Sequence, residues 1–190
     1  MILPIRAFGD AVLRKHCHEI NPDYPELKSL VENMFETMHS ANGIGLAAPQ
    51  IGLDIRLFIV DVSPLAEDED YEDIAHELKD FKKVFINAKI LEETGEEWKF
   101  NEGCLSIPDV REDVKRKETI LIEYYDENFV KHTDTFSDMR ARVIQHEYDH
   151  IEGILFTDHL SSLKKKLVKG KLMKISQGDV SVTYKMRFPK

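Results

Sequence analysis

The chain has 190 residues, which is enough for one domain with a sizeable hydrophobic core. Its 42% hydrophobic and 32% charged residues are typical of a globular protein and exclude a disordered or fibrous chain, and no apolar run is long enough to cross a bilayer. The net charge of −9 argues against stable DNA binding, and two cysteines are too few for a disulfide framework. We therefore expect a single domain over residues 1–190, without membrane partners, and a cytoplasmic location because the amino end resembles neither a signal nor a transit peptide.

The first predicted element is an amphipathic helix that Pro25 opens. Its apolar residues recur at helical spacing: Leu27, Leu30, Val31, Met34 and Met38. The helix should end at Asn42-Gly43, with the glycine in the left-handed conformation.

Five short stretches rich in β-branched and aromatic residues follow, and they predict antiparallel strands. These are residues 56–62, 84–93, 96–100, 118–126 and 129–135. Thr94-Gly95 is a predicted turn between the second and third strands. The acidic stretch 64–83 should form a solvated loop or a short surface helix.

Two more helices are expected after the strands. Met139, Val143 and Ile144 precede His146 and His150 at helical spacing, Gly153 should end this helix, and Ser137 or Thr135 could cap it. A basic helix at about 158–176 should bury an apolar face: Leu160, Leu163, Leu167, Val168 and Leu172. From residue 161 onward there are nine Lys or Arg residues and one acidic residue, a local charge of +8, and the tail after Gln177 alternates like a strand. These helices and antiparallel strands predict the α+β fold class.

The stretch QHEYDH, residues 145–150, predicts a metal site on the helix that Gly153 ends. On a helix His146 and His150 lie one above the other, so both imidazoles can reach one ion, and Glu147 is beside them. This is the H-E-x-x-H pattern of metal-dependent hydrolases, in which the glutamate acts as general base.

A catalytic ion of this kind needs a third protein ligand. The extended motif with a third histidine fails because Phe156 occupies that position. No glutamate follows Glu152, which leaves only awkward downstream candidates: Asp158, His159 and Asp179. Cys104, in the stretch EGCLSIP, is therefore our expected third ligand, although a lone cysteine can also be a small buried hydrophobe. Cys17 stands between His16 and His18, but adjacent side chains diverge, so we expect a packed cysteine and partly exposed histidines there.

The stretch GIGLAAPQIG, residues 43–52, satisfies a G-x-G-x-x-A pattern with Gly43, Gly45 and Ala48. A dinucleotide loop must follow a strand and open a helix, whereas this one follows a helix and leads into strands, so the cofactor interpretation fails. The glycines allow another chain to approach the backbone closely, and Gln50 offers an uncharged hydrogen-bond donor. A purely structural turn is the alternative.

The stretches GIGLAAPQ, EGCLS and QHEYDH, in this order and at these separations, resemble the three signature motifs of peptide deformylase. The resemblance spans nearly the whole chain. It implies a fold of antiparallel strands around a helix that carries the two histidines. It also implies an enzyme that removes the formyl group from the N-terminal formylmethionine of newly made bacterial proteins, releasing formate.

Carried over position by position, the resemblance implies that Cys104, His146 and His150 are the metal ligands. Glu147 would be the general acid and base, and Gln50 together with the main-chain N–H of Leu105 would stabilise the oxyanion. Members of this family use Fe²⁺ in cells, and Zn²⁺, Ni²⁺ or Co²⁺ can replace it. An exposed iron–thiolate pair would be sensitive to peroxide.

The substrate peptide should lie along Gly43, Ile44 and Gly45 as an added strand. A methionine pocket would be lined by Ile44, Met139, Val143 and the face of His146. Glu102 should pair with a basic residue, for which Arg116 is the candidate, and Arg111 could reach the substrate farther along.

The basic helix is, in this family, associated with docking on the ribosome, which its charge fits, although a solvated polar face is the alternative. Other functions also remain open at this point. A zinc metallopeptidase could use the same H-E-x-x-H helix without Cys104, and a metal-stabilised binding module would need no catalysis. The acidic stretch 64–83 and the tail after residue 176 leave the subclass open.

Overall fold

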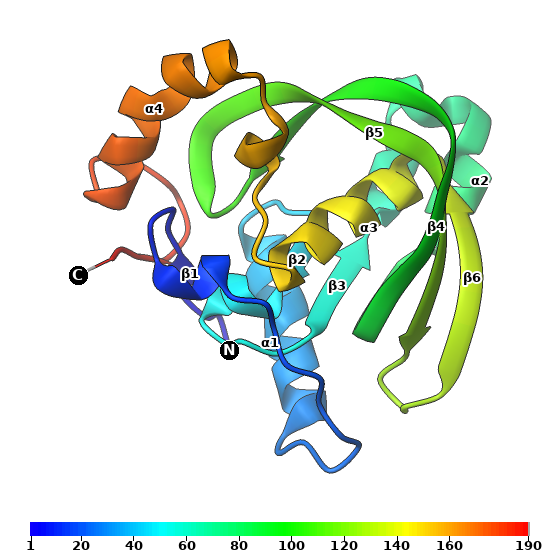
Figure 1. Ribbon diagram of the computed structural model, residues 1–190. Coiled ribbons are helices and arrows are strands. Elements are labelled where there is room, and N and C mark those ends of the chain that lie inside the picture. The colour runs from blue at the N-terminus through cyan, green and yellow to red at the C-terminus, as the bar shows by residue number, and fades with distance from the viewer. Residues whose placement is uncertain (190) are drawn as a thin grey trace.

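The computed structural model describes residues 1–189, and its main feature is a five-stranded sheet wrapped around a helix (Figure 1). The sheet has the order β2-β3-β4-β5-β6 and is antiparallel throughout. Its strands are β2 (Gly45–Ala47), β3 (Leu57–Asp61), β4 (Lys82–Cys104), β5 (Ile107–Tyr125) and β6 (Lys131–Ser137). The central helix α3 (Asp138–Ile151) contacts β2, β3, β5 and β6, which confirms the predicted α+β arrangement.

Alternation along β3 explains why the sheet has a core on each face. Phe58 and Val60 point into the core shared with α3, whereas Leu57 and Ile59 point into the core shared with α1 (Leu27–Ser40). All five residues of β3 are buried, as expected for a strand covered on both sides.

The helix α1 lies where the sequence predicts it, but its end differs from the prediction. Asn42, not Gly43, adopts the left-handed conformation, with φ of 54°. Asparagine tolerates this conformation. Gly43 is needed for another reason, because a Cβ there would lie 2.8 Å from Leu105 Cδ1.

The predicted turn at Thr94-Gly95 is wrong. β4 runs continuously through it, with an irregularity in register between Thr94 and Glu97 and a φ of 82° at Gly95. Gly95 therefore lies in a β-bulge within β4 and not in the turn that we predicted. Residues 107–117 also pair as strand, and the resulting long β4–β5 hairpin arches over α3 (Figure 1).

The acidic stretch 64–83 forms short helical turns on the surface, as predicted. These are the 3₁₀ segments Ser63–Glu67 and Glu69–Ile74 and the helix α2 (Ala75–Leu78). Other 3₁₀ segments are Ala11–Arg14, Ala48–Ile51 and Phe156–His159. The cap of α3 differs from the prediction: the Ser137 side chain makes no capping bond, and Asp138 Oδ1 instead accepts the Arg140 N–H at 3.0 Å.

The basic helix α4 (Ser162–Ser176) packs against β5, but with a narrower buried face than predicted. Val168 and Ile175 are buried, whereas Leu163 and Leu167 are 68% and 70% exposed. The prediction that these two leucines pack inward is wrong, because α4 lies on the surface and touches the domain along one thin stripe.

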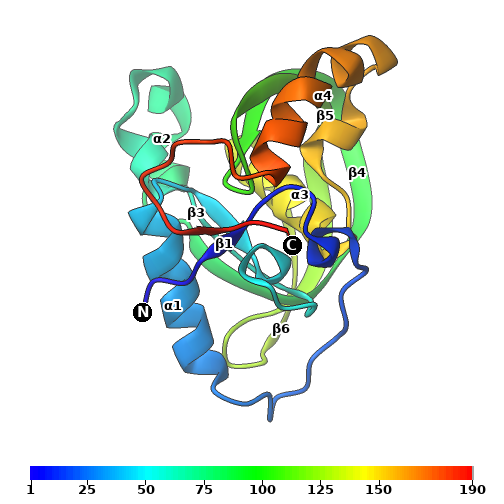
Figure 2. The same cartoon turned by 90° about the vertical axis from the view of Figure 1, so that its left-hand side faces the viewer.

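The tail after α4 returns across the molecule to the amino end (Figure 2). Only β7 (Met186–Arg187) of the predicted strand-like tail is hydrogen-bonded as a strand, parallel to β1 (Ile5–Arg6). The alternating burial is nevertheless present, since Val180, Val182, Tyr184, Met186 and Phe188 are half-buried. No helix within residues 1–189 is both long enough and apolar enough to span a membrane.

Candidate metal centre and active site

The tip of the β4–β5 hairpin brings the EGCLS stretch to α3. Cys104 is the last residue of β4, and Leu105 and Ser106 form the turn into β5. Gly103 pairs with Arg111 and Cys104 with Ile107 in the ladder. Sheet hydrogen bonds thus hold the backbone of Cys104 at the tip of the hairpin.

Three ligand atoms of Cys104, His146 and His150 lie within 4.8 Å of one another. The two histidines are one helical turn apart on α3, with ring centroids 5.1 Å apart, and Cys104 Sγ is 3.3 Å from His150 Nε2. Metal–ligand bonds of about 2.0–2.3 Å to imidazole and thiolate fit inside such a cluster. One thiolate and two imidazoles suit a divalent transition metal and leave a coordination position open for water or substrate.

Glu102 orients His146 from behind. Its Oε2 is 3.0 Å from His146 Nδ1, so the other ring nitrogen is left to face Cys104. The same carboxylate accepts two hydrogen bonds from Arg116, at 2.7 and 3.0 Å, and one from Arg142 at 3.0 Å. The predicted Glu102–Arg116 pair is confirmed.

This network keeps Glu102 ionised although it is 4% exposed. Burial opposes the charge, but hydrogen bonds with His146 and Arg116 hold the pKa of Glu102 well below its usual range. Arg116 extends the network by donating to Asp149 at 2.8 Å, and Asp149 also contacts His159. A partner of this kind fixes the ring orientation of a ligand histidine and raises its basicity.

Glu147 lies at the bottom of the site and is 3% exposed. Burial raises the pKa of its carboxyl to about 7. Its Oε2 has no hydrogen-bond partner among residues 1–189. A buried carboxylate with a free oxygen and a pKa near neutrality is suited to exchange protons with a reacting group.

Gln50 is held with its amide N–H groups toward the cysteine. Its Oε1 accepts the Ala47 N–H at 2.7 Å. Its Nε2 is 3.4 Å from both Cys104 Sγ and Ser106 Oγ. The Leu105 N–H makes no hydrogen bond to another residue of the described chain, so two donors can face the same side of the site.

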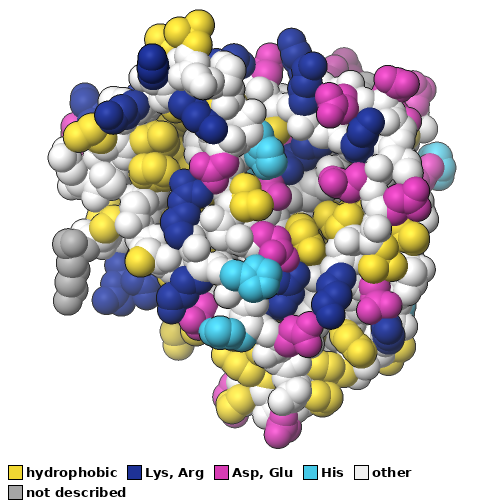
Figure 3. Space-filling view, in the orientation of Figure 1, with side chains coloured by type: hydrophobic (Ala, Val, Ile, Leu, Met, Phe, Trp, Pro, Cys, Tyr) yellow, Lys and Arg dark blue, Asp and Glu magenta, His cyan; other side chains and the backbone are white. Residues whose placement is uncertain are grey.

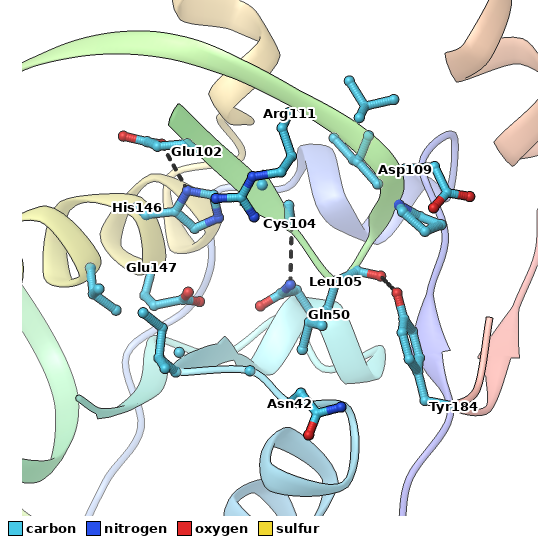
Figure 4. A pocket seen from close by; sticks show the side chains of 18 of the residues that line it. Asn42, Gln50, Glu102, Cys104, Leu105, Asp109, Arg111, His146, Glu147 and Tyr184 are labelled. Carbon is cyan, nitrogen blue, oxygen red and sulfur yellow. Dashed lines mark hydrogen bonds and ion pairs between the residues drawn. The ribbon is translucent and has the colours of Figure 1, made fainter. Parts of the chain in front are cut away.

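These groups open into one cavity of about 690 Å³ (Figure 4). Every predicted substrate-binding residue lines it: Gly43, Ile44, Gly45, Glu102, Arg111, Met139 and Val143. Arg111 is partly engaged elsewhere, because its Nε and Nη2 donate to Asn101 at 3.0 and 2.6 Å.

The sequence reasoning missed several lining residues. Arg142 is 2% exposed, stacks over the Trp98 ring at 4.2 Å and lines the cavity with Phe100. Its position four residues before His146, on the same helix face, was the available signal. Residues 181–184 of the tail also line the cavity, and no local pattern indicated that.

The His16-Cys17-His18 stretch is structural, as predicted. Cys17 is 2% exposed, whereas the His16 and His18 side chains are 71% and 76% exposed. His16 pairs with Glu152 instead of a common centre.

A Cys-His-His cluster beside the glutamate of an H-E-x-x-H helix, inside a sheet-wrapped cavity, defines a metal-dependent hydrolase. The polypeptide deformylase family model matches residues 2–166. A peptide deformylase of Christiangramia forsetii is 62% identical over 100% of this chain and 97% of that protein. One of Flavobacterium johnsoniae is 60% identical over 99% and 96%.

Solved structures agree with the sequence comparisons. A peptide deformylase from Legionella pneumophila superposes with a TM-score of 0.79 at 34% identity, covering 94% of this chain and 98% of that chain. The chain therefore belongs to the peptide deformylase family, whose metal-dependent enzymes remove the N-formyl group from an N-terminal methionine. Membership of this family decides against the metallopeptidase and the non-catalytic binding module. The family model ends at residue 166, whereas the Christiangramia forsetii protein also aligns with the residues after it.

Proposed function

We propose that this chain deformylates nascent polypeptides in the cytoplasm with Cys104, His146 and His150 as its metal ligands. The convergence of these three ligand atoms beside Glu147 carries the proposal. When bound, a divalent cation supplies the Lewis acidity that activates water and polarises the formyl oxygen.

Glu147 acts as general base and then as general acid. Its free Oε2 takes a proton from the attacking water, and the water oxygen forms a bond to the formyl carbon. Glu147 then delivers that proton to the departing amine as the carbon–nitrogen bond breaks. Formate and a free amino terminus result.

Gln50 and the Leu105 N–H stabilise the charge that develops on the formyl oxygen. The Ala47 N–H fixes the Gln50 amide, so no reorganisation is needed when the charge forms. Loss of one such donor typically lowers kcat by roughly 100- to 1,000-fold.

The open edge of β2 binds the substrate backbone. β2 is an edge strand paired only with β3, so its outer side can accept a peptide as an added strand. The methionine side chain enters the pocket between Ile44, Met139 and Val143, with Arg142 and Phe100 at its wall. This mode gives affinity with little dependence on the sequence after methionine.

We propose Fe²⁺ as the native metal. The thiolate of Cys104 favours soft or borderline ions and supplies negative charge to the ion. Protein purified without oxygen should contain iron and should release formate from formyl-Met-Ala-Ser. Cys104→Ser should lose both metal and activity. Protein purified without oxygen that contains no iron would refute Fe²⁺ as the native metal, and a correctly metallated sample without formate release would refute the deformylase activity.

We propose that α4 docks on the ribosome. Figure 3 shows Lys and Arg side chains interspersed with hydrophobic ones over α4. Leu163, Leu167 and Met173 are exposed among these lysines, a combination that suits an RNA-rich surface with protein components. Lys164 is already paired with Glu112 at 2.8 Å, so Lys165, Lys166 and Lys169 are the better test.

The experiment is co-sedimentation with ribosomes across a salt series. Changing Lys165, Lys166 and Lys169 to Glu should abolish binding, and added salt should weaken that of the unaltered protein. The matched control changes three exposed lysines on α1, after α2 and near the start of β4, namely Lys28, Lys79 and Lys89. Binding that ignores both salt and the α4 substitutions would reject docking through this helix.

A further inference from the structure

The tail after α4 is fastened at both ends. Gly178, with φ of 80°, reverses the chain after α4. Farther along, the Ile5 N–H donates to the Lys185 carbonyl and the Ala7 N–H to the Arg187 carbonyl, both at 2.9 Å. Val180, Met186 and Phe188 pack against the core under α4. The segment between these anchors is therefore held in place.

That segment, residues 181–184, borders the active-site cavity. Ser181, Val182, Thr183 and Tyr184 line the same cavity as Cys104 and Glu147. The Tyr184 hydroxyl donates to the Leu105 carbonyl at 2.8 Å (Figure 4). Leu105 also packs closely on Gly43. Leu105 thus lies between the substrate edge and the tail.

The backbone of the segment has free hydrogen-bonding capacity. Residues 180–184 make no backbone hydrogen bond to any other residue between 1 and 189, by N–H or by C=O. The active-site cavity is therefore bordered by two rows of unpaired main-chain groups, one on the open edge of β2 and one on this segment. Such groups accept an extended peptide readily.

The substrate residues that lie next to this segment are those after the formylmethionine, as the length of an extended peptide shows. Leu105 follows Cys104 directly, and an extended peptide advances about 3.3–3.6 Å per residue. A peptide whose formyl carbon lies at Cys104 and which runs toward the tail has its methionine level with Leu105, so its second and third residues lie beyond Leu105, on the side of Tyr184. Figure 4 shows Tyr184 beside Leu105 and on the other side of it from Glu147 and His146.

We propose that residues 181–184 form a second wall of the peptide channel and bind the main chain of the second and third substrate residues, with Tyr184 as the residue that positions the wall. The inference rests on the substrate orientation given under the proposed function. It makes the tail a determinant of how well peptides longer than formylmethionine are used.

The first experiment compares formyl-Met-Ala-Ser with formyl-methionine amide, which ends before the tail. Tyr184→Phe removes the hydrogen bond and keeps the ring. It should lower the ratio of kcat/KM for the tripeptide to that for the amide by about three- to tenfold, the range expected for one hydrogen bond. Lys185→Ala, an exposed side chain that directly follows the segment and does not line the cavity, is the matched control and should leave the ratio unchanged.

The second experiment is hydrogen–deuterium exchange and does not depend on turnover. Metal-loaded Glu147→Gln protein with formyl-Met-Ala-Ser should show slower exchange of the amides of residues 180–184 than with formyl-methionine amide. Amides of the acidic turns 67–73 serve as the internal reference. Equal exchange with both ligands, or a ratio unchanged in Tyr184→Phe, would overturn the second wall, whereas absent activity on both substrates would count against the deformylase roles instead.

Discussion

The Glu147 side chain fills the space that any side chain on residue 45 would need, so only glycine fits at this position. A Cβ on Gly45 would lie 2.8 Å from both Cγ and Cδ of Glu147, and closer still to Oε1. The edge strand that should bind substrate and the residue that should move the proton are therefore in direct contact. Binding of the substrate backbone along β2 and proton transfer by Glu147 therefore both depend on the absence of a side chain at Gly45.

Gly45→Ala should accordingly lower kcat by about 100-fold or more, because a shift of about 1 Å in a catalytic group has that effect. The fold should survive, since the glycine has no left-handed φ. Formate release from formyl-Met-Ala-Ser measures the loss. Gly170→Ala is the control: nothing lies within 4 Å of the added methyl, and a helical Gly-to-Ala change adds about 1 kcal/mol of stability.

Glu147→Gln should lower kcat by about 10²–10⁴-fold while metal content stays at the level of the unaltered protein. The amide keeps the size of the side chain but cannot accept the proton. Metal analysis and the formate assay on the same preparation separate the two effects. An active Glu147→Gln protein would require another base.

Glu102→Gln should weaken metal binding by about 10- to 100-fold, because His146 loses the carboxylate that orients it. It should also destabilise the fold by about 3–5 kcal/mol, since the buried Arg142 would lose its carboxylate partner, whereas Arg116 would keep Asp149. Competition with a chelator and denaturant unfolding measure the two losses. Glu97→Gln, exposed on β4, should change neither.

The two thiols should react differently with iodoacetamide at pH 8. Burial raises the pKa of Cys17 to about 11, so its thiolate is scarce at this pH, and the side chain is 2% exposed. Cys104 is half-buried and should react once the metal is removed. Mass spectrometry should find one adduct in the metal-free protein, none in the loaded protein and two after denaturation. Two adducts on the native protein would contradict the buried placement of Cys17.

Peroxide should inactivate the iron-loaded protein and spare the zinc-loaded one. Iron beside a thiolate promotes oxidation of Cys104, whereas zinc does no redox chemistry. Residual activity and the mass of the peptide that contains Cys104 report the outcome. Iron-loaded protein that keeps full activity and an unoxidised Cys104 would refute the prediction.

Local sequence was sufficient for much of the site. A four-residue spacing puts His146 and His150 on one face of any helix, and elimination of downstream ligands left Cys104 as the third. The Glu102–Arg116 pair was also anticipated. By contrast, the Thr94-Gly95 turn and the buried leucines of α4 were wrong, because a bulge and a surface position satisfy the same local patterns.

The amino-acid sequence alone determined the ligand types and their spacing on α3, since periodicity and side-chain chemistry act over a few residues. Only the tertiary structure decided that residues 181–184 would line the cavity, that Gly45 would face Glu147 and that Tyr184 would reach Leu105, 79 residues away in sequence. Such contacts depend on the curvature of the β4–β5 hairpin and on the return of the tail to β1. Long-range packing sets both, and no local pattern encodes it.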